Sequence, residues 1–190
     1  MLRRRVANII GCLAMIVLIS CSAQPETNTI NEQLVLQEVQ NMQLTSPAFQ
    51  NNTLIPSTYT CDGKNINPPL KISDIPKEVK SLVLIIDDPD SVKPAGKVWD
   101  HWIVFNIPPS TTIIPEGKEP QGVHGKGTGG NLKYHGPCPP DAEHRYYFKL
   151  YALDTQLSLP EGSTKLEVEK SMERHIIEKT ELIGRYNRKR

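Results

Sequence analysis

The apolar positions of this chain gather in one run at its start and in three shorter runs further along. Leu82–Ile86 is a continuous apolar run, typical of a strand that is buried on both faces. His101–Ile107 is aromatic and β-branched and is followed by two prolines, which favours a second strand that ends there. Arg145–Leu153 alternates between polar and apolar residues, which predicts a third strand with one apolar face. That face carries Tyr146, Phe148, Leu150 and Ala152.

Helical spacing occurs only late in the chain. Thr164–Glu167 fits a capping box, in which a Thr and a Glu three residues later bond each other's backbone N–H groups. Apolar residues then recur at near-helical intervals as far as Gly184, a plausible helix stop. These residues are Leu166, Met172, Ile176, Ile177 and Ile183. Strands first and a helix last predict a mainly β fold, an antiparallel β-sandwich with peripheral helices and a C-terminal helix.

The start of the chain has the pattern of an export signal. Met1–Arg5 is basic, and Val6–Ile19 is apolar but shorter than the roughly 20 residues that a membrane-spanning helix needs. The run ends in Leu-Ile-Ser-Cys, which resembles the bacterial lipobox and makes Cys21 the expected site of lipidation, for example with palmitate. The alternative is an ordinary signal peptide with an incidental cysteine. The lipobox predicts a lipoprotein in the bacterial cell envelope, anchored to a membrane on the extracytoplasmic side.

The rest of the chain is expected to be a tether followed by one domain. Residues 1–20 are the predicted signal peptide, and residues 21–41 are polar and read as a tether. Residues 42–190 are then a single domain, since this length suits one hydrophobic core.

Charge argues against a nucleic-acid partner. The whole chain has 22 Lys and Arg against 21 Asp and Glu, a net charge of +1. Cleavage after residue 20 removes three arginines, which leaves 19 against 21 and a net charge of −2. Proteins that bind nucleic acids usually need a basic surface to neutralise phosphates. A G-x-G-x-x-G match at Gly125–Gly130 lies in a Gly-rich stretch without the strand and helix of a dinucleotide site, so no cofactor is predicted.

Export changes how the remaining cysteines are interpreted. Cys61 and Cys138 would lie in an oxidising compartment, where a disulfide is the default expectation. A bond between them would close a loop of 77 residues and stabilise the fold by roughly 4 kcal/mol in the chain-entropy model. The alternative is that both are buried thiols.

Polar residues with useful chemistry lie at the ends of the predicted strands. Asp88 follows the first strand, His101 opens the second and His144 opens the third, shortly after the rigid turn Gly136–Pro140. If these strands are neighbours, one mouth would hold two imidazoles, a carboxylate and unpaired turn amides, which together make an anion site. The remaining histidines lack such a setting and are predicted at the surface: His124, His135 and His175.

Two other chemistries can be assembled from the same residues. Two histidines and a carboxylate would suit a metal, but the chain has no tight metal-ligand spacing, so no metal is predicted. Cys138, His144 and Asp88 could form a thiol hydrolase, but a disulfide at Cys138 would remove its nucleophile. There is also no Gly-x-Ser-x-Gly nucleophile motif. A binding protein is therefore favoured over an enzyme.

Four segments together resemble the phosphatidylethanolamine-binding protein family, in its bacterial Raf-kinase-inhibitor-like branch. In chain order they are Tyr59–Gly63 with Asn67–Leu70, Asp87–Asp90, Asp100–Trp102 with Asn106–Pro108, and Gly136–Pro140 with His144–Tyr146. The likeness runs from about Met42 to Gly184, and four motifs in the correct order are far more specific than one.

The resemblance implies a sandwich of two antiparallel sheets with a small pocket for phosphate, acetate and phosphoryl headgroups. Carried over by motif, the ligand-binding residues would be Asp88, Asp90, His101, Gly136, Pro137, Cys138, Pro139, Pro140, His144 and Tyr146. Asp88 would fix an imidazole tautomer or meet a headgroup amine, while the histidines, the turn amides and the Tyr146 hydroxyl would hold the anion. Where the family often reads Asp-Pro-Asp-Ala-Pro, this chain has Asp-Pro-Asp-Ser-Val, so a less rigid turn is expected.

The sequence thus predicts a membrane-anchored binding protein for a phosphate-like anion or a phospholipid headgroup. The alternatives are an inhibitor of an envelope protease or another protein partner, and the Cys/His hydrolase. The family includes several unrelated roles, so the fold alone does not choose among them.

Overall fold

The structure is a computed structural model that describes residues 41–188. The predicted signal peptide, Cys21 and all but the last residue of the predicted tether lie outside the described residues. Met42 is buried, and the first strand, β1 (Gln43–Thr45), follows it directly.

A six-stranded sheet forms the centre of the fold, in the order β2-β9-β8-β4-β5-β7. Its strands are β2 (Thr53–Leu54), β4 (Ser81–Asp88), β5 (Trp99–Ile107), β7 (Val123–His124), β8 (His144–Leu153) and β9 (Ile176–Tyr186). All pairings are antiparallel except β2 with β9, so the sheet is mixed. The three predicted strands are confirmed and lie side by side, with β4 between β8 and β5.

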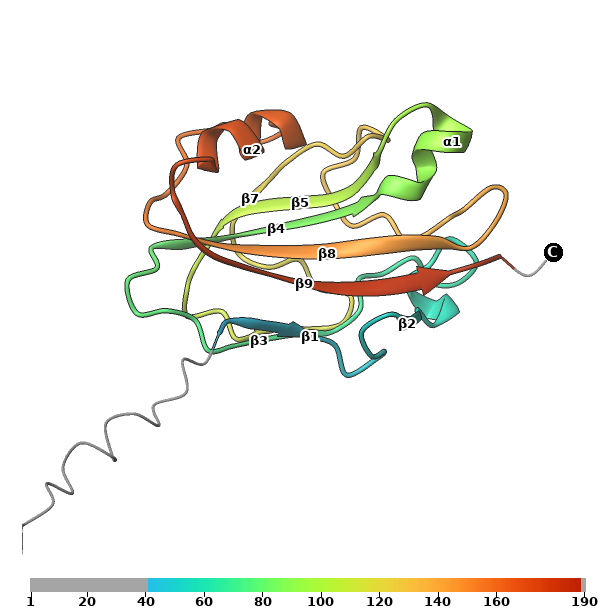
Figure 1. The fold of residues 1–190 in the computed structure, drawn as a ribbon, viewed down its shortest axis with the longest axis horizontal. Coiled ribbons are helices and arrows are strands. Elements are labelled where there is room, and N and C mark those ends of the chain that lie inside the picture. Colours follow the sequence, from blue (N-terminus) through green and yellow to red (C-terminus); the bar gives the residue numbers. More distant parts are fainter. Residues whose placement is uncertain (1–40, 189–190) are drawn as a thin grey trace, which may run out of the picture. The chain divides into compact units, whose positions relative to one another are not determined.

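A three-stranded antiparallel sheet packs against one face of the large sheet (Figure 1). It has the order β1-β3-β6, with β3 at Leu70–Ser73 and β6 at Ile113–Ile114. The core between the two sheets receives the predicted apolar face of β8, which is fully buried there. The mainly β sandwich is therefore confirmed.

Strand β4 is buried along its whole length, as its continuous apolar run predicts. Leu82, Leu84 and Ile86 join the core between the sheets, whereas Val83 and Ile85 join a second core on the other face. The helix α2 (Lys165–Met172) covers this second core with Val168 and Met172. The alternation of a strand thus explains why every residue of the run is apolar.

The predicted C-terminal helix is correct at its start and wrong at its end. Both bonds of the Thr164–Glu167 capping box are present. The helix ends at Met172, however, and β9 follows, paired with β8 along nearly its whole length. Within β9, Leu182, Gly184 and Tyr186 are buried with a period of two, so Gly184 lies inside a strand and does not stop a helix.

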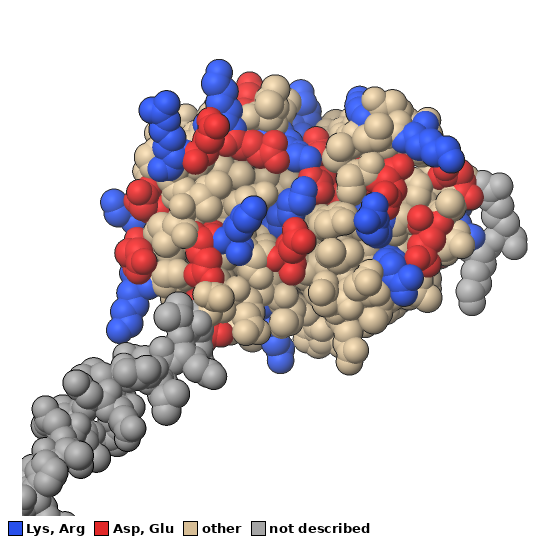
Figure 2. Space-filling model, viewed as in Figure 1, with Lys and Arg blue, Asp and Glu red and all other residues tan. Residues whose placement is uncertain are grey.

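Short helical turns complete the described fold. They are η1 (Ser57–Tyr59), η2 (Pro89–Ser91) and α1 (Val92–Ala95). No helix among residues 41–188 is long and apolar enough to cross a membrane. Figure 2 shows acidic and basic side chains interspersed over the visible face, with no single-sign patch of the kind that a polyanion would need.

Candidate functional site

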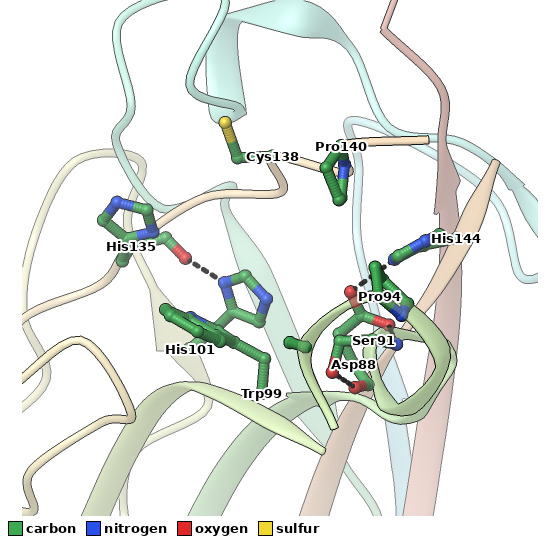
Figure 3. A pocket seen from close by; sticks show the side chains of 10 residues that line it. Asp88, Ser91, Pro94, Trp99, His101, His135, Cys138, Pro140 and His144 are labelled. Carbon is green, nitrogen blue, oxygen red and sulfur yellow. Dashed lines mark hydrogen bonds and ion pairs between the residues drawn. The ribbon is translucent and has the colours of Figure 1, made fainter. Parts of the chain in front are cut away.

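A small cavity opens at the end of the large sheet where β4 ends and β8 begins. Its volume is about 190 Å³, below the roughly 300–1,000 Å³ that is typical of pockets for drug-sized ligands. Three segments line it: the end of β4 with η2 and α1, the start of β5, and the loop that leads into β8 (Figure 3). The lining residues are Asp88, Ser91, Pro94, Ala95, Trp99, His101, His135, Cys138, Pro140 and His144.

Asp88 is buried at the end of β4 and caps the turn that follows it. Its Oδ1 accepts a hydrogen bond from the Ser91 amide (3.1 Å), and the Ser91 hydroxyl reaches the backbone carbonyls of Asp88 and Lys97. Burial raises the pKa of Asp88, although hydrogen bonds from His144 and Ser91 oppose the rise. Residues 89–95 form η2 and α1 and provide one wall of the cavity.

His144, the first residue of β8, lies between two carboxylates. Its Nδ1 is 2.8 Å from Asp88 Oδ2, and its Nε2 is 2.9 Å from Asp141 Oδ1. Burial lowers the pKa of His144, but the two carboxylates outweigh burial and hold the pKa above its ordinary value. A carboxylate at each ring nitrogen favours the doubly protonated imidazole at the edge of the cavity.

His101 has the opposite electrostatic state. Its Nδ1 is 2.7 Å from the carbonyl oxygen of His135, and its Nε2 is buried without a hydrogen bond. Burial lowers the pKa of His101 to about 4, so the ring is neutral at neutral pH. His135 stacks against it at 6.1 Å and also lines the cavity. The prediction of a surface His135 is therefore wrong; its position directly before the Gly136 turn was the available signal.

The turn Gly136–Pro140 forms a wall of the cavity but does not offer the unpaired amides that we expected. The Gly136 amide donates to Asn65 Oδ1 (2.7 Å). Three of the five residues are prolines and have no N–H group. The remaining amide, that of Cys138, opposes the rise that burial causes in the pKa of Tyr146, although the Tyr146 hydroxyl itself makes no hydrogen bond.

A disulfide joins Cys61 to Cys138 and ties this turn to the segment after η1. The Cys61 amide also donates to the Pro137 carbonyl (3.1 Å). Cys138 therefore carries no free thiol, which removes the nucleophile of the Cys/His hydrolase. Among the described residues, no group of three His, Cys, Asp or Glu side chains is arranged to hold a metal.

Several predicted site residues lie outside the cavity wall. Asp90 faces Arg145, whose backbone amide, Nε and Nη2 all donate to its carboxylate at 2.7–2.9 Å. Tyr146 is fully buried behind the wall, with its ring edge against His101 at 5.3 Å between ring centres. Gly136, Pro137 and Pro139 shape the turn, whereas Cys138 and Pro140 reach the cavity.

Comparison with known proteins places the chain among close relatives. The family model described as phosphatidylethanolamine-binding protein matches residues 45–187. A UPF0098 protein of Methanothermobacter thermautotrophicus is 50% identical over 153 residues, which cover 77% of this chain and 99% of the relative. A UPF0098 protein of Chlamydia trachomatis is 50% identical over 150 residues and also covers 77% of this chain and 99% of the relative.

Solved structures agree in fold. A phosphatidylethanolamine-binding protein homologue of Chlamydia trachomatis has a TM-score of 0.74 and 49% identity over 78% of this chain and 99% of its own. YbcL of E. coli, described as a member of the mammalian family, has a TM-score of 0.72 and 30% identity over 79% of this chain and 100% of its own. This chain belongs to the phosphatidylethanolamine-binding protein family.

Proposed function

We propose that the domain binds a small phosphate-like anion, free or as a headgroup, in the cavity beside Asp88, His101 and His144. The observation that carries this proposal is the cavity itself. Side chains that lie 56 positions apart in the chain meet there, and the His144–Asp88 pair is buried at its edge. His135 lines the same cavity, and its buried Nδ1 makes no hydrogen bond, so this imidazole is left to bind an anion.

A thermal-shift titration tests the proposal. Phosphate, phosphoethanolamine, phosphocholine and acetate are added to the wild-type protein and to the His144→Ala and Asp88→Asn variants. A ligand that binds only the folded state stabilises it by about 2.7 kcal/mol at 100 times its dissociation constant. We expect a rise in melting temperature for the wild-type protein that is lost in both variants.

Matched controls separate the pocket from general effects. His175 pairs with Asp154 on the exposed surface, so His175→Ala and Asp154→Asn make the same chemical changes away from the cavity. Both controls are expected to respond to the ligands as the wild type does. Unchanged ligand affinity in His144→Ala and Asp88→Asn would contradict the proposed pocket.

We further propose that the protein is a lipoprotein of the bacterial cell envelope, anchored through Cys21. This proposal rests on the Leu-Ile-Ser-Cys order after a basic and apolar leader. Growth with labelled palmitate is expected to label the wild-type protein and not a Cys21→Ser variant. Equal labelling of the two proteins would contradict lipidation at Cys21.

A further inference from the structure

His101 is held in a single tautomer by the backbone. A carbonyl oxygen can only accept a hydrogen bond, so the Nδ1 atom that lies 2.7 Å from the His135 carbonyl must carry the proton. In a neutral imidazole the other nitrogen is then an acceptor. His101 Nε2 therefore presents a lone pair and not an N–H group.

This lone pair faces the cavity. His101 is only 4% exposed, and its Nε2 is buried without a partner. Figure 3 shows the ring reaching from β5 into the space between the Cys138–Pro140 turn and the Asp88–His144 pair. A buried acceptor without a partner is costly, so a ligand that supplies a donor gains from filling this position.

The groups around His101 keep it neutral. Burial is the largest influence and lowers the pKa of His101. The hydrogen bond to the His135 carbonyl and the charge of Asp87 raise the pKa, the His135 and His144 side chains lower it, and burial outweighs the groups that raise it. Asp87 is already paired with Lys149 and Lys165. The ring therefore stays an acceptor over the neutral pH range.

Donors in the described cavity wall are mostly in use. The Gly136 amide is held by Asn65, the Ser91 amide by Asp88, and both His144 nitrogens by carboxylates. The His135 ring remains available, since its buried Nδ1 makes no hydrogen bond. The indole N–H of Trp99 in the same wall is a further donor. The wall can thus donate from His135 and Trp99 but must accept at His101.

We infer that the cavity selects an oxyanion that carries its own proton, a P–OH group that donates to His101 Nε2. This inference rests on the proposed anion pocket and specifies its ligand class. Free phosphate and the protonated form of a phosphomonoester have such a group. Sulfate at neutral pH and the phosphodiester of an intact phospholipid do not. For these, an oxygen lone pair would meet the lone pair of His101.

The experiment compares three oxyanions that differ mainly in whether one of their oxygens carries a proton. Inorganic phosphate, sulfate and dimethyl phosphate are titrated calorimetrically into the full chain in detergent, at neutral pH and constant ionic strength. We expect phosphate to bind at least 10-fold more tightly than either of the others, because a site built to pair with a ligand hydroxyl rejects analogues that lack it.

The outcomes separate the inference from the proposed function. Similar affinities for phosphate and sulfate would overturn the selection for a proton but would leave the anion pocket intact. Binding of dimethyl phosphate as tight as that of phosphate would also overturn it, and would favour a phosphodiester headgroup. If none of the three probes binds, both proposals fail.

A variant and a spectroscopic measurement test the role of His101 directly. In His101→Gln, the side-chain amide can turn either its oxygen or its N–H group to the ligand, so the preference for phosphate over sulfate is expected to fall several-fold. If this variant does not fold, ¹⁵N NMR of the wild-type protein still decides. We expect an unprotonated Nε2 signal for His101 at neutral pH, and a protonated Nε2 would overturn the inference.

Discussion

Three histidines at one cavity have three different hydrogen-bonding states. His144 lies between two carboxylates that favour its protonated form, His101 is a neutral acceptor, and His135 holds His101 through its backbone carbonyl. For each of them the sequence shows only a histidine and its position in the chain, which does not distinguish their chemical states. The partner atoms and the degree of burial decide the chemistry, because each shifts the balance between the charged and neutral imidazole.

His101 should make the fold sensitive to acid. Its pKa of about 4 in the folded protein lies below the ordinary value of 6.5. Between these two pH values the ring binds a proton in the unfolded chain but not in the folded protein. The stability that this provides is complete above pH 6.5 and is lost as the pH falls to about 4, a loss of about 3 kcal/mol. Urea unfolding of the wild type and His101→Gln across this range should show the smaller loss in the variant.

The titration of His144 changes the folding stability in the opposite direction and in a different pH range. Its pKa is raised in the folded protein, so the stability that it provides is present below pH 6.5 and is lost as the pH rises above that value. Asp88, whose pKa is also raised, contributes in the acid range as well, so the effect of His101 is taken from the difference between the wild type and His101→Gln. Parallel stability curves for the wild type and His101→Gln between pH 6.5 and 4 would contradict the neutral buried state of His101.

Strand β9 shows how neighbouring elements override a local pattern. Residues 176–186 contain several charged residues and apolar residues at nearly helical intervals, and α2 does begin where the capping box predicts. The segment nevertheless pairs with β8 from Leu153 to His144, and this long ladder satisfies its backbone groups. The buried positions of β9 are confined to its last five residues, where every second residue faces the core.

Gly184 is the position where this correction can be tested. A Cβ atom there would lie 2.4–2.5 Å from side-chain atoms of Ile55 and 3.0 Å from Phe49. Gly184→Ala is therefore expected to lower the free energy of unfolding by about 1–3 kcal/mol, as overpacking of a core does. Urea denaturation measures the change. The control is Glu181→Ala, at an exposed position of the same strand, and equal stabilities of the two variants would contradict this packing.

At the scale of the described domain, a disulfide beside the cavity joins segments that lie far apart in the sequence. The disulfide fixes the turn before β8 to the segment after η1, and hydrogen bonds from Cys61 and Tyr134 reinforce the same junction. The turn would otherwise depend on a few contacts, since prolines supply three of its five residues and cannot donate from the backbone. The wall of the cavity is thus part of the global stability of the domain.

Removal of the disulfide should weaken the fold and the pocket together. In a Cys61→Ser, Cys138→Ser double variant, we expect the free energy of unfolding to fall by roughly 4 kcal/mol, because the bond closes a 77-residue loop. Phosphate affinity should fall as well, since Cys138 lines the cavity. Unfolding in denaturant and phosphate titration measure the two effects. Thiol alkylation of the native wild-type protein without reductant should add no mass at these cysteines, and full alkylation would contradict the bond.

The sequence by itself determined the features that depend on neighbours along the chain. Local hydrophobic periodicity, together with residues that begin or end an element, predicts strands β4, β5 and β8 and the capped start of α2. It also predicts that Asp88, His101 and His144 lie at strand ends. The tertiary structure alone decided β9, the place of His135 in the cavity wall, the pairing of Asp90 with Arg145, and the loss of free amides in the Gly136–Pro140 turn. These depend on hydrogen-bond partners and burial contributed by segments tens of residues away, and no local pattern specifies which partner a polar group will find.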